Sequence, residues 1–463
     1  MKIRFLTISL ISLLVSLLGA TLVLANTYTV DTLTDSADDD ECVIDTTFRD
    51  AIGCAKDNAG ADIIDFSGSG TILFTDWATA ITDTEGVTID GGGDIILDGD
   101  DQTYQAMNLL GTNIQVKGLT FKNFGGTELY VNGSNNTVGG PLVADRNVFI
   151  RDVGVTSGNS VYVSGTGNTI QGNYIGTQAD GDTWAGRQMG IGIGGTSNNI
   201  LIEDNVITTA NYCSITWGGD LGNITVVGNN IGINADGDTG FDAGSGICDT
   251  PAVGGPNETY SGSIIIGGDT GVDATARNII SGSGVGILLK GDYIGGMKIQ
   301  GNYIGTDVNG TSSVAGWNGI SMQNLSCSGG DGCFIGGDAA GKRNVISGNS
   351  NNGIYFHGTD VTGWQIQNNY IGVNKNGDTA LANGGSGIFI ESSGTDITIG
   401  AASYPNIISG NNSLGIGTNN ASGAITINGN YIGLNAAGTG AVANGSDGIR
   451  INGSTAALTL VVG

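Results

Sequence analysis

The stretch Gly429-Asn430-Tyr431-Ile432-Gly433 decides the fold, because close copies of it recur along the chain. A second phrase, Asn406-Ile407-Ile408-Ser409-Gly410 in its clearest form, alternates with the first from residue 128 to the end. Copies of the first phrase stand at 172–177, 228–233, 301–306, 368–373 and 429–434, and copies of the second at 278–282, 344–349 and 406–411. Such regular self-similarity is the sequence signature of a repeat architecture.

Each segment opens with Gly-Ile and an alternating apolar run, and the openers from Gly286 to Gly448 are 33, 34, 34, 28 and 33 residues apart. Each repeat contains three short runs in which residues alternate between the two faces of a strand. In one of these runs Ile354 points to one face and Tyr355 to the other. Three strands in each turn, one apolar face and no intervening helical pattern require like strands to stack in parallel. We therefore predict an all-β, single-stranded right-handed parallel β-helix, a solenoid of about twelve turns.

The N-terminal region differs in composition from the repeats. Residues 1–25 combine Lys2 and Arg4 with an apolar run and a small-residue site, which predicts a secretory signal peptide, with an uncleaved membrane anchor as the alternative. Residues 26–61 are expected to cap the solenoid, with a short amphipathic helix from Thr47 to Asn58 over the open first turn. Residues 62–463 form the β-helix. Because the chain stops in mid-turn at 458–463, we expect a truncated C-terminus or an exposed last strand.

Charge limits the partners of the protein. The full sequence has a formal net charge of −27, and losing two of its 16 basic residues with the signal leaves 14 against 43 acidic residues, or −29. Such a balance repels nucleic acid and anionic membrane surfaces. We expect neither as a partner of the mature chain, which would be a monomer or part of a longer multidomain protein.

Two segments resemble known families. Residues 47–52 (TFRDAI) followed by 58–66 (NAGADIIDF) are similar to the CSLREA segment that precedes parallel β-helix repeats in many exported bacterial proteins, although Thr46 and Asp50 depart from its Cys and Glu. The repeats from residue 105 onward resemble the pectin-lyase-like right-handed β-helix superfamily. This resemblance implies the fold and a bacterial, secreted or cell-surface location. The clustered Asp residues of the superfamily's hydrolases, and the Ca²⁺ with an Arg or Lys base of its lyases, are not recognisable here.

Six cysteines in an exported chain predict structural disulfides. We expect Cys42 with Cys54 in the cap and Cys327 with Cys333 across a short loop. Cys213 and Cys248 lie on adjacent turns, but their alternation phases differ, so their pairing is not favoured.

Stacking in register makes outward columns readable from the sequence. The fourth residue after each opener places His357, the single histidine, about 5 Å from Glu391 and two turns from Lys290. The second residue after each opening glycine places Tyr355 beside Phe389. These residues are candidates for acid–base catalysis and for sugar stacking, respectively. The alternative is an ordinary exposed cross-strand ion pair beside surface aromatics.

The tyrosines of the repeated phrase form a second aromatic column. Tyr303, Tyr370 and Tyr431 are two turns apart, or about 10 Å, which suits a glycan lying along the rod. The alternative is that these rings pack over neighbouring corners. Three arginines, Arg146, Arg277 and Arg343, either present cations to an anionic glycan or neutralise nearby carboxylates.

Acidic loops follow several copies of the phrase. Their carboxylates are spaced like oxygen ligands for Ca²⁺, which makes weak calcium sites of Asp180, Asp182, Asp236 and Asp238. The equivalent loop at 435–440 has no carboxylate, so an Asx-type turn that forms without an ion is the competing interpretation. No cofactor is required, and Ca²⁺ is the one candidate.

Together these features predict an exported, non-catalytic β-helix that presents an extended surface for polysaccharide binding or adhesion to a cell-surface glycan. The alternative is a polysaccharide lyase or glycoside hydrolase of the same fold. An enzyme should interrupt the repeat where its site lies, and the longest interruption, 246–285, holds only scattered aspartates.

Overall fold

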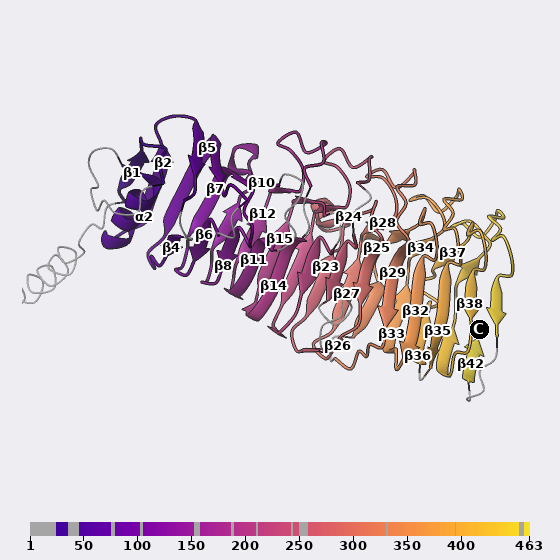
Figure 1. Cartoon of the computed structure of the whole chain (residues 1–463). Coiled ribbons are helices and arrows are strands. Elements are labelled where there is room, and N and C mark those ends of the chain that lie inside the picture. The colour runs from indigo at the N-terminus through magenta and orange to yellow at the C-terminus, as the bar shows by residue number, and fades with distance from the viewer. Residues whose placement is uncertain are drawn as a thin grey trace, which may run out of the picture.

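A computed structural model shows a long rod of stacked strands (Figure 1). It describes residues 25–35, 46–75, 79–101, 105–151, 158–186, 189–209, 212–241, 244–249, 258–329, 332–393, 395–452 and 458–463. Residues 1–24 of the proposed signal peptide and Cys42 lie outside these ranges, so neither expectation is tested. None of the helices in the described part of the chain has the length and apolar character needed to cross a bilayer.

Apart from a separate pair, β22 (Thr259–Tyr260) with β26 (Asp292–Tyr293), the described strands form three parallel ladders, and each complete turn contributes one strand to each ladder, as the sequence predicts. The first ladder is one sheet; it has 14 strands, and without the off-path β18 (Asp220–Leu221) 13 stack in succession. They are β4 (Thr79–Ile81), β6 (Met107–Leu109), β8 (Leu129–Val131), β11 (Asn159–Thr166), β14 (Met189–Asn198), β17 (Ile215–Trp217), β21 (Ile247–Asp249), β25 (Val285–Leu289), β29 (Asn318–Gln323), β32 (Ile354–Thr359), β35 (Ile388–Ser393), β38 (Ile416–Thr418) and β41 (Ile449–Ile451).

The second and third ladders share one 26-stranded sheet, because the long strands β5 (Val87–Asp98) and β7 (Gln115–Lys122) run through both. The second ladder continues with β9 (Thr137–Gly139), β12 (Thr169–Gln171), β15 (Ile200–Glu203), β19 (Ile224–Val227), β23 (Ile264–Gly267), β27 (Met297–Gln300), β30 (Cys333–Gly336), β33 (Thr362–Gln367), β36 (Thr395–Ile399), β39 (Gly423–Ile427) and β42 (Leu458–Val462). The third continues with β10 (Val148–Ile150), β13 (Tyr174–Ile175), β16 (Val206–Ile207), β20 (Asn230–Ile231), β24 (Ile279–Ile280), β28 (Tyr303–Ile304), β31 (Val345–Ile346), β34 (Tyr370–Ile371), β37 (Ile407–Ile408) and β40 (Tyr431–Ile432).

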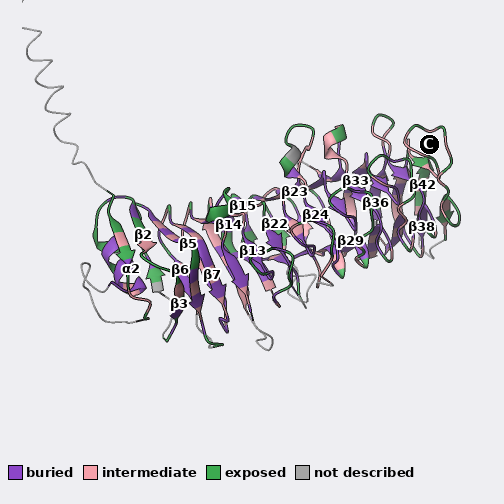
Figure 2. Cartoon of the chain, turned by 90° about the horizontal axis from the view of Figure 1, so that it is seen from above, coloured by how far each residue is buried: buried purple, intermediate pink, exposed green. Residues whose placement is uncertain are grey.

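The chain is therefore a right-handed parallel β-helix. Side chains alternate between the two faces of each strand, and the inward-facing ones form a continuous core. In this core Ile320, Ile354 and Ile388 pair in register and are fully buried. Figure 2 shows this buried interior running the length of the rod. Each further turn adds such contacts to its neighbours, so stability accumulates along the stack.

The N-terminal end is covered as expected. Helix α2 (Phe48–Asp57) begins at Thr47, whose hydroxyl accepts from the Asp50 N–H while the Asp50 carboxylate accepts from the Thr47 N–H. Its buried side, which includes Phe48, Ala51 and Ile52, belongs to the same core as the strands. Strand β1 (Thr27–Val30) pairs in parallel with β2 (Asp62–Phe66), so the sheet already begins before the helix; β3 (Gly70–Leu73) pairs with β5.

A buried row of asparagines joins the second and third ladders. The Asn302 side chain donates to the backbone carbonyl of Ile266 and to Oδ1 of Asn344, at 2.9 and 3.1 Å. The row comprises Asn147, Asn173, Asn205, Asn229, Asn278, Asn302, Asn344, Asn369, Asn406 and Asn430. These are the asparagines of the two repeated phrases, and they satisfy backbone groups that the sharp corner leaves without strand partners.

Candidate functional site

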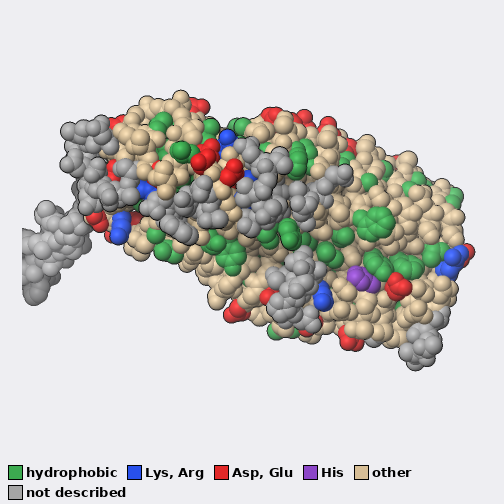
Figure 3. Space-filling view, viewed as in Figure 1, with side chains coloured by type: hydrophobic (Ala, Val, Ile, Leu, Met, Phe, Trp, Pro, Cys, Tyr) green, Lys and Arg blue, Asp and Glu red, His purple; other side chains and the backbone are tan. Residues whose placement is uncertain are grey.

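The outer surface of the first ladder brings together the residues that the sequence placed in columns. Ser321, Tyr355 and Phe389 pair in register across β29, β32 and β35. In the same strands His357 pairs with Glu391. The predicted adjacency of these two residues is confirmed, and Figure 3 shows the single histidine on this surface near hydrophobic and acidic side chains.

Three rings form a continuous aromatic surface here, which we call the first-ladder platform: Tyr355, His357 and Phe389. The Tyr355 and His357 rings are stacked, with centroids 4.7 Å apart and an interplanar angle of 11°. The Tyr355 and Phe389 rings lie 6.1 Å apart at 27°. All three side chains are partly exposed, so the platform combines an accessible apolar surface with polar edges.

The Glu391 carboxylate holds one edge of the platform. It accepts from the Tyr355 hydroxyl at 2.7 Å and from the Asn419 side-chain amide at 2.8 Å. Partial burial, and then the hydrogen bond and negative charge of Glu391, raise the pKa of Tyr355 to about 12. Tyr355 is therefore a protonated hydrogen-bond donor at neutral pH.

The His357 ring has a different partner. Its Nε2 lies 3.2 Å from the Ser321 hydroxyl. Burial lowers the pKa of His357, and the nearby Glu391 charge opposes this shift without cancelling it. The imidazole is therefore predominantly neutral at neutral pH. Since the Glu391 oxygens bond to Tyr355 and Asn419, the histidine and the carboxylate are neighbours that use separate partners.

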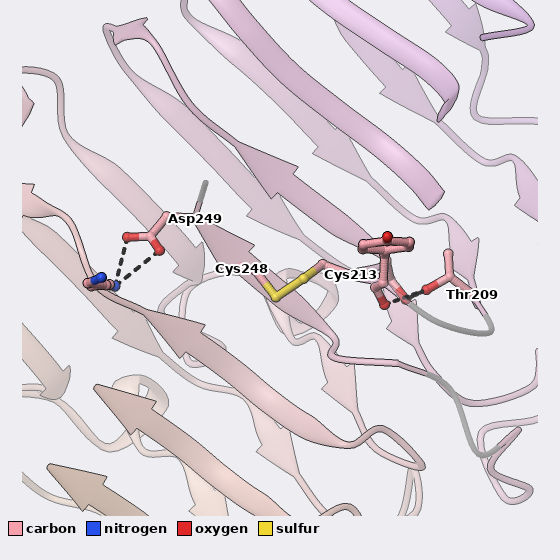
Figure 4. The surroundings of a disulfide bond; sticks show 7 residues. Thr209, Cys213, Cys248 and Asp249 are labelled. Atoms are coloured by element: carbon pink, nitrogen blue, oxygen red, sulfur yellow. Dashed lines mark hydrogen bonds between the residues drawn. A yellow bond between two sulfur atoms is a disulfide. The ribbon is translucent and has the colours of Figure 1, made fainter. Parts of the chain in front are cut away.

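Lys290 is not brought to the histidine. It follows β25, and β29 lies between β25 and β32, the strand that carries His357. The Lys290 backbone N–H donates to the buried Asp249 carboxylate at 2.8 Å (Figure 4). The structure thus gives the catalytic candidate Lys290 no direct contact with the predicted acid–base pair.

Trp317 is an exposed aromatic residue that sequence reasoning missed. It directly precedes β29 and is 56% exposed. An indole of this exposure offers stacking area of its own at the start of the strand. The sequence shows that Trp317 lies three residues before Ile320, a residue of the stacked core column. It does not show that the Trp317 side chain is exposed.

The tyrosine column of the repeated phrase is not a sugar-stacking ladder, and that prediction is wrong for Tyr303 and Tyr370. These rings are only 5% and 7% exposed, as Tyr174 is at 8%, while Tyr431 is 38% exposed. Their spacing is as predicted, because Tyr303 and Tyr370 each pair with the same intervening residue, Val345. The alternative of packing over the corners is the one observed.

The three arginines cover these rings. The guanidinium carbons of Arg146, Arg277 and Arg343 lie 3.7, 4.0 and 4.2 Å from the ring centroids of Tyr174, Tyr303 and Tyr370. Arg343 also donates to the Asn368 side chain at 2.8 Å. Both earlier interpretations, glycan contact and carboxylate neutralisation, therefore miss the main contact, which is a cation–π pair across neighbouring turns.

The acidic loops cover the tyrosines as well. A Cβ at Gly181 would lie 2.7 Å from the Tyr174 ring, so only glycine allows this loop to approach the ring so closely. The Asp180 carboxylate accepts from the backbone N–H groups of Asp182 and Thr183 at 3.0 and 2.9 Å, as in an Asx-type turn.

The second acidic loop is organised differently. The Asn234 amide donates to the carboxylates of Asp182 and Asp238, both at 3.0 Å, and Asp236 donates its N–H toward Asp182. No group of three or more His, Cys, Asp or Glu side chains in the described ranges is arranged to hold a metal ion. Calcium binding by these four aspartates stays an untested prediction.

Two disulfides are present among the described cysteines. Cys327 pairs with Cys333, as expected. Cys213 pairs with Cys248, and here the prediction was wrong (Figure 4). Cys213 lies in the connection before β17 rather than in the strand, so strand alternation does not set its direction, and it reaches the outward position of Cys248 on β21. Cys54 is also disulfide-bonded. Because Cys42 lies outside the described residues, the Cys42–Cys54 pairing stays a prediction.

Comparisons with known proteins give weak structural likenesses. No known family of sequences matches the chain, and no curated protein matches it either, so the CSLREA resemblance stays a prediction. The A-module of a mannuronan C-5 epimerase from Azotobacter vinelandii has a TM-score of 0.32 at 12% identity, over 87% of this chain and 91% of the module.

Two further solved structures are comparable. A PL6 alginate lyase in complex with a trisaccharide has a TM-score of 0.34 at 14% identity, over 96% of this chain and 88% of the lyase. Tailspike protein 3 of bacteriophage CBA120 has a TM-score of 0.35 at 12% identity, over 88% of this chain and 56% of the tailspike. These scores are low, so the architecture rests on the strand pairing of the chain itself.

Proposed function

We propose that this protein is an exported, non-catalytic rod whose first-ladder platform binds an uncharged polysaccharide. The observation that carries the proposal is the arrangement of Tyr355, His357 and Phe389 as adjoining, partly exposed rings with hydrogen-bonding groups at their edges. Sugars have apolar ring faces and hydroxyl groups at their edges. Aromatic rings stack against the faces, and neighbouring polar groups form hydrogen bonds with the hydroxyls. The disulfides support export, because they persist in oxidising compartments.

The charge of the chain favours an uncharged polymer. The formal net charge is −27, and the platform itself contains the Glu391 carboxylate. The cations in the same outward columns are Lys290, which follows β25 two strands away from β32, and Arg450 on β41, which is bonded to Asp447 at 2.7 Å. A polyanionic glycan would therefore be repelled by the whole surface and would meet no cluster of cations at the platform.

The contacts of the acid–base candidates favour binding over catalysis. Catalysis needs a group that exchanges a proton near neutral pH with a reacting atom. Tyr355, with its pKa of about 12, keeps its proton in a hydrogen bond to Glu391, and the Nε2 of His357 lies beside the Ser321 hydroxyl although His357 and Glu391 are paired in register. A lyase or hydrolase remains the competing function, and calcium at the acidic loops remains a separate proposal.

One experiment tests the proposal. A panel of immobilised neutral and acidic polysaccharides is exposed to the wild type and to Tyr355→Ala and Phe389→Ala, with Tyr431→Ala as the control because Tyr431 is an exposed tyrosine outside the platform. We expect binding to a neutral polymer that weakens at least about tenfold, or ~1.4 kcal/mol, in the two platform variants only.

The same samples are assayed for new reducing ends and unsaturated products. Release of either product by the wild type, abolished in His357→Ala, would overturn the non-catalytic assignment. Binding that is retained in both platform variants would overturn the site.

A further inference from the structure

A polar cavity lies on the outer side of the second ladder, on a different sheet from the first-ladder platform. Its volume is about 460 Å³, which is within the range of small-ligand sites. The residues that define its chemistry are Asp269, Lys298, Gln300, Phe334, Lys342 and Gln367. We call it the second-ladder pocket.

The pocket exists because two long connections flank a short one. Residues 268–278 join β23 to β24 and residues 337–344 join β30 to β31, and each contains a short 3-10 helix. Between them β27 is followed at once by a tight corner at Gly301 and β28. The two long connections meet, because Thr270 donates to the Gly341 carbonyl through its N–H at 3.0 Å and its hydroxyl at 2.9 Å. They project from one edge of the rod in Figure 2.

An aromatic ring and two amides form the floor. Lys298 and Phe334 are successive outward residues that pair across β27 and β30, and Gln367 of β33 pairs with Gly336. Gln300 is only 7% exposed, and its amide nitrogen donates to the Gly336 carbonyl at 3.1 Å. A Cβ at Gly337 would lie 3.0 Å from that nitrogen. Because residue 337 is glycine, no side chain at this position covers the Gln300 amide.

The walls carry charges of both signs. The Asp338 carboxylate and the Lys342 ammonium form an ion pair at 2.6 Å, and Asp269 accepts from the Gly271 N–H at 3.0 Å. Two lysines and two carboxylates around one cavity give little net charge. Donors, acceptors and a ring face in a balanced site suit a ligand with many hydroxyl groups and no charge of its own.

We propose that the second-ladder pocket binds a single uncharged sugar residue, with its ring against Phe334 and its hydroxyls bonded to Gln300, Gln367 and the wall carboxylates. The pocket lies on a different sheet from the first-ladder platform, so this inference stands independently of the function proposed for that face. A rod with both sites would hold a main chain on one face and a branch or terminal sugar on another.

The test uses saturation-transfer NMR on the full chain with the methyl glycosides of glucose, galactose and mannose, N-acetylglucosamine, and galacturonic acid as a charged comparator. At least one neutral sugar should receive saturation, and its affinity should fall at least tenfold in Phe334→Ala and in Gln367→Ala. Tyr431→Ala, which lies in neither the second-ladder pocket nor the first-ladder platform, should leave the signal intact. Thermal melting of each variant confirms folding, and Gln367→Ala keeps the test valid if Phe334→Ala unfolds.

Three results would overturn the proposal: saturation of none of the neutral sugars, preference for galacturonic acid, or an unchanged signal in both pocket variants. Loss of the signal in Tyr355→Ala alone would assign the sugar to the first-ladder platform instead.

Discussion

The rod carries two aromatic columns that look alike in the sequence and differ in the structure. Tyr355 and Phe389 on the first ladder are partly exposed, whereas Tyr303 and Tyr370 on the third ladder are buried beneath arginines and glycine loops. Periodicity identifies both columns equally well. Whether a ring faces solvent is decided by the residue that the neighbouring turn places over it.

The last copy of the phrase shows this dependence within one column. Tyr370 is covered by Arg343, which directly precedes Asn344 of the previous turn. The residue in the same position before Asn406 is Pro405, and the corresponding tyrosine, Tyr431, is 38% exposed. The two copies share Asn-Tyr-Ile-Gly, but the surroundings of their rings differ in two ways: Pro405 stands where Tyr370 has Arg343, and Tyr431 lies on β40, the last strand of the third ladder, whereas β37 stacks on β34.

Truncating the two columns should separate stability from binding. Tyr370→Ala is expected to lower the free energy of unfolding by about 3–5 kcal/mol, because it empties a buried site between a guanidinium and a loop. Glycan binding at the first-ladder platform should be unchanged. Urea unfolding followed by circular dichroism measures the first, and the polysaccharide panel the second.

Tyr355→Ala is the matched substitution and should show the reverse pattern, with weakened binding and a much smaller loss of stability. Equal stability losses in the two variants would mean that the columns do not differ as described.

Closing the space over a buried ring should have the next largest effect. A Cβ at Gly377 would lie 2.8 Å from the Tyr370 ring, and the residue has a φ of +70°. We expect Gly377→Ala to destabilise the protein by about 2–3 kcal/mol through strain and overpacking. Gly438→Ala is the control, because its φ is +69° but the nearest Tyr431 ring atom would be 3.5 Å away. It should therefore show the backbone strain alone.

Removing the arginine should convert a buried ring into an exposed one. Arg343→Ala is expected to cost about 1–2 kcal/mol, through the lost cation–π contact, and to increase quenching of tyrosine fluorescence by acrylamide. Pro405→Arg should do the opposite to Tyr431 and reduce quenching. If Arg343→Ala leaves quenching unchanged, the loop rather than the arginine shields the ring.

The smallest effect is expected from pH. Burial lowers the pKa of His357 below the unfolded value, so the unfolded chain binds a proton more readily than the folded chain. The contribution to stability is complete above the unfolded pKa and is lost as pH falls through about 6.5 toward the folded pKa. The fall in melting temperature between about pH 7.5 and about pH 5 should be smaller in His357→Gln than in the wild type. Proton NMR of the single imidazole gives the folded pKa directly, and a value above 6.5 would contradict this sign.

The repeat made the fold and the register predictable. The spacing of the openers placed His357 beside Glu391 and Tyr355 beside Phe389, and the strand pairing agrees. It could not give the direction of Cys213, because that residue lies outside the alternating strand.

Other features depend on contacts between turns that no periodic pattern states. The arginines over the tyrosines and the second-ladder pocket arise from side chains and loops of different turns. The asparagine row was within reach of the sequence, because both phrases keep an Asn at the same corner, but its burial and its side-chain hydrogen bonds were not.

The Cys213–Cys248 bond joins β21 to the connection that precedes the neighbouring β17. Most contacts of a solenoid are between adjacent turns, so once one end frays the loss can travel turn by turn along the length. A disulfide between two turns stops this stepwise unfolding, because the joined turns cannot separate. We expect this bond, near the middle of the rod, to let each half lose its end under tension or proteolysis while the other half keeps its structure.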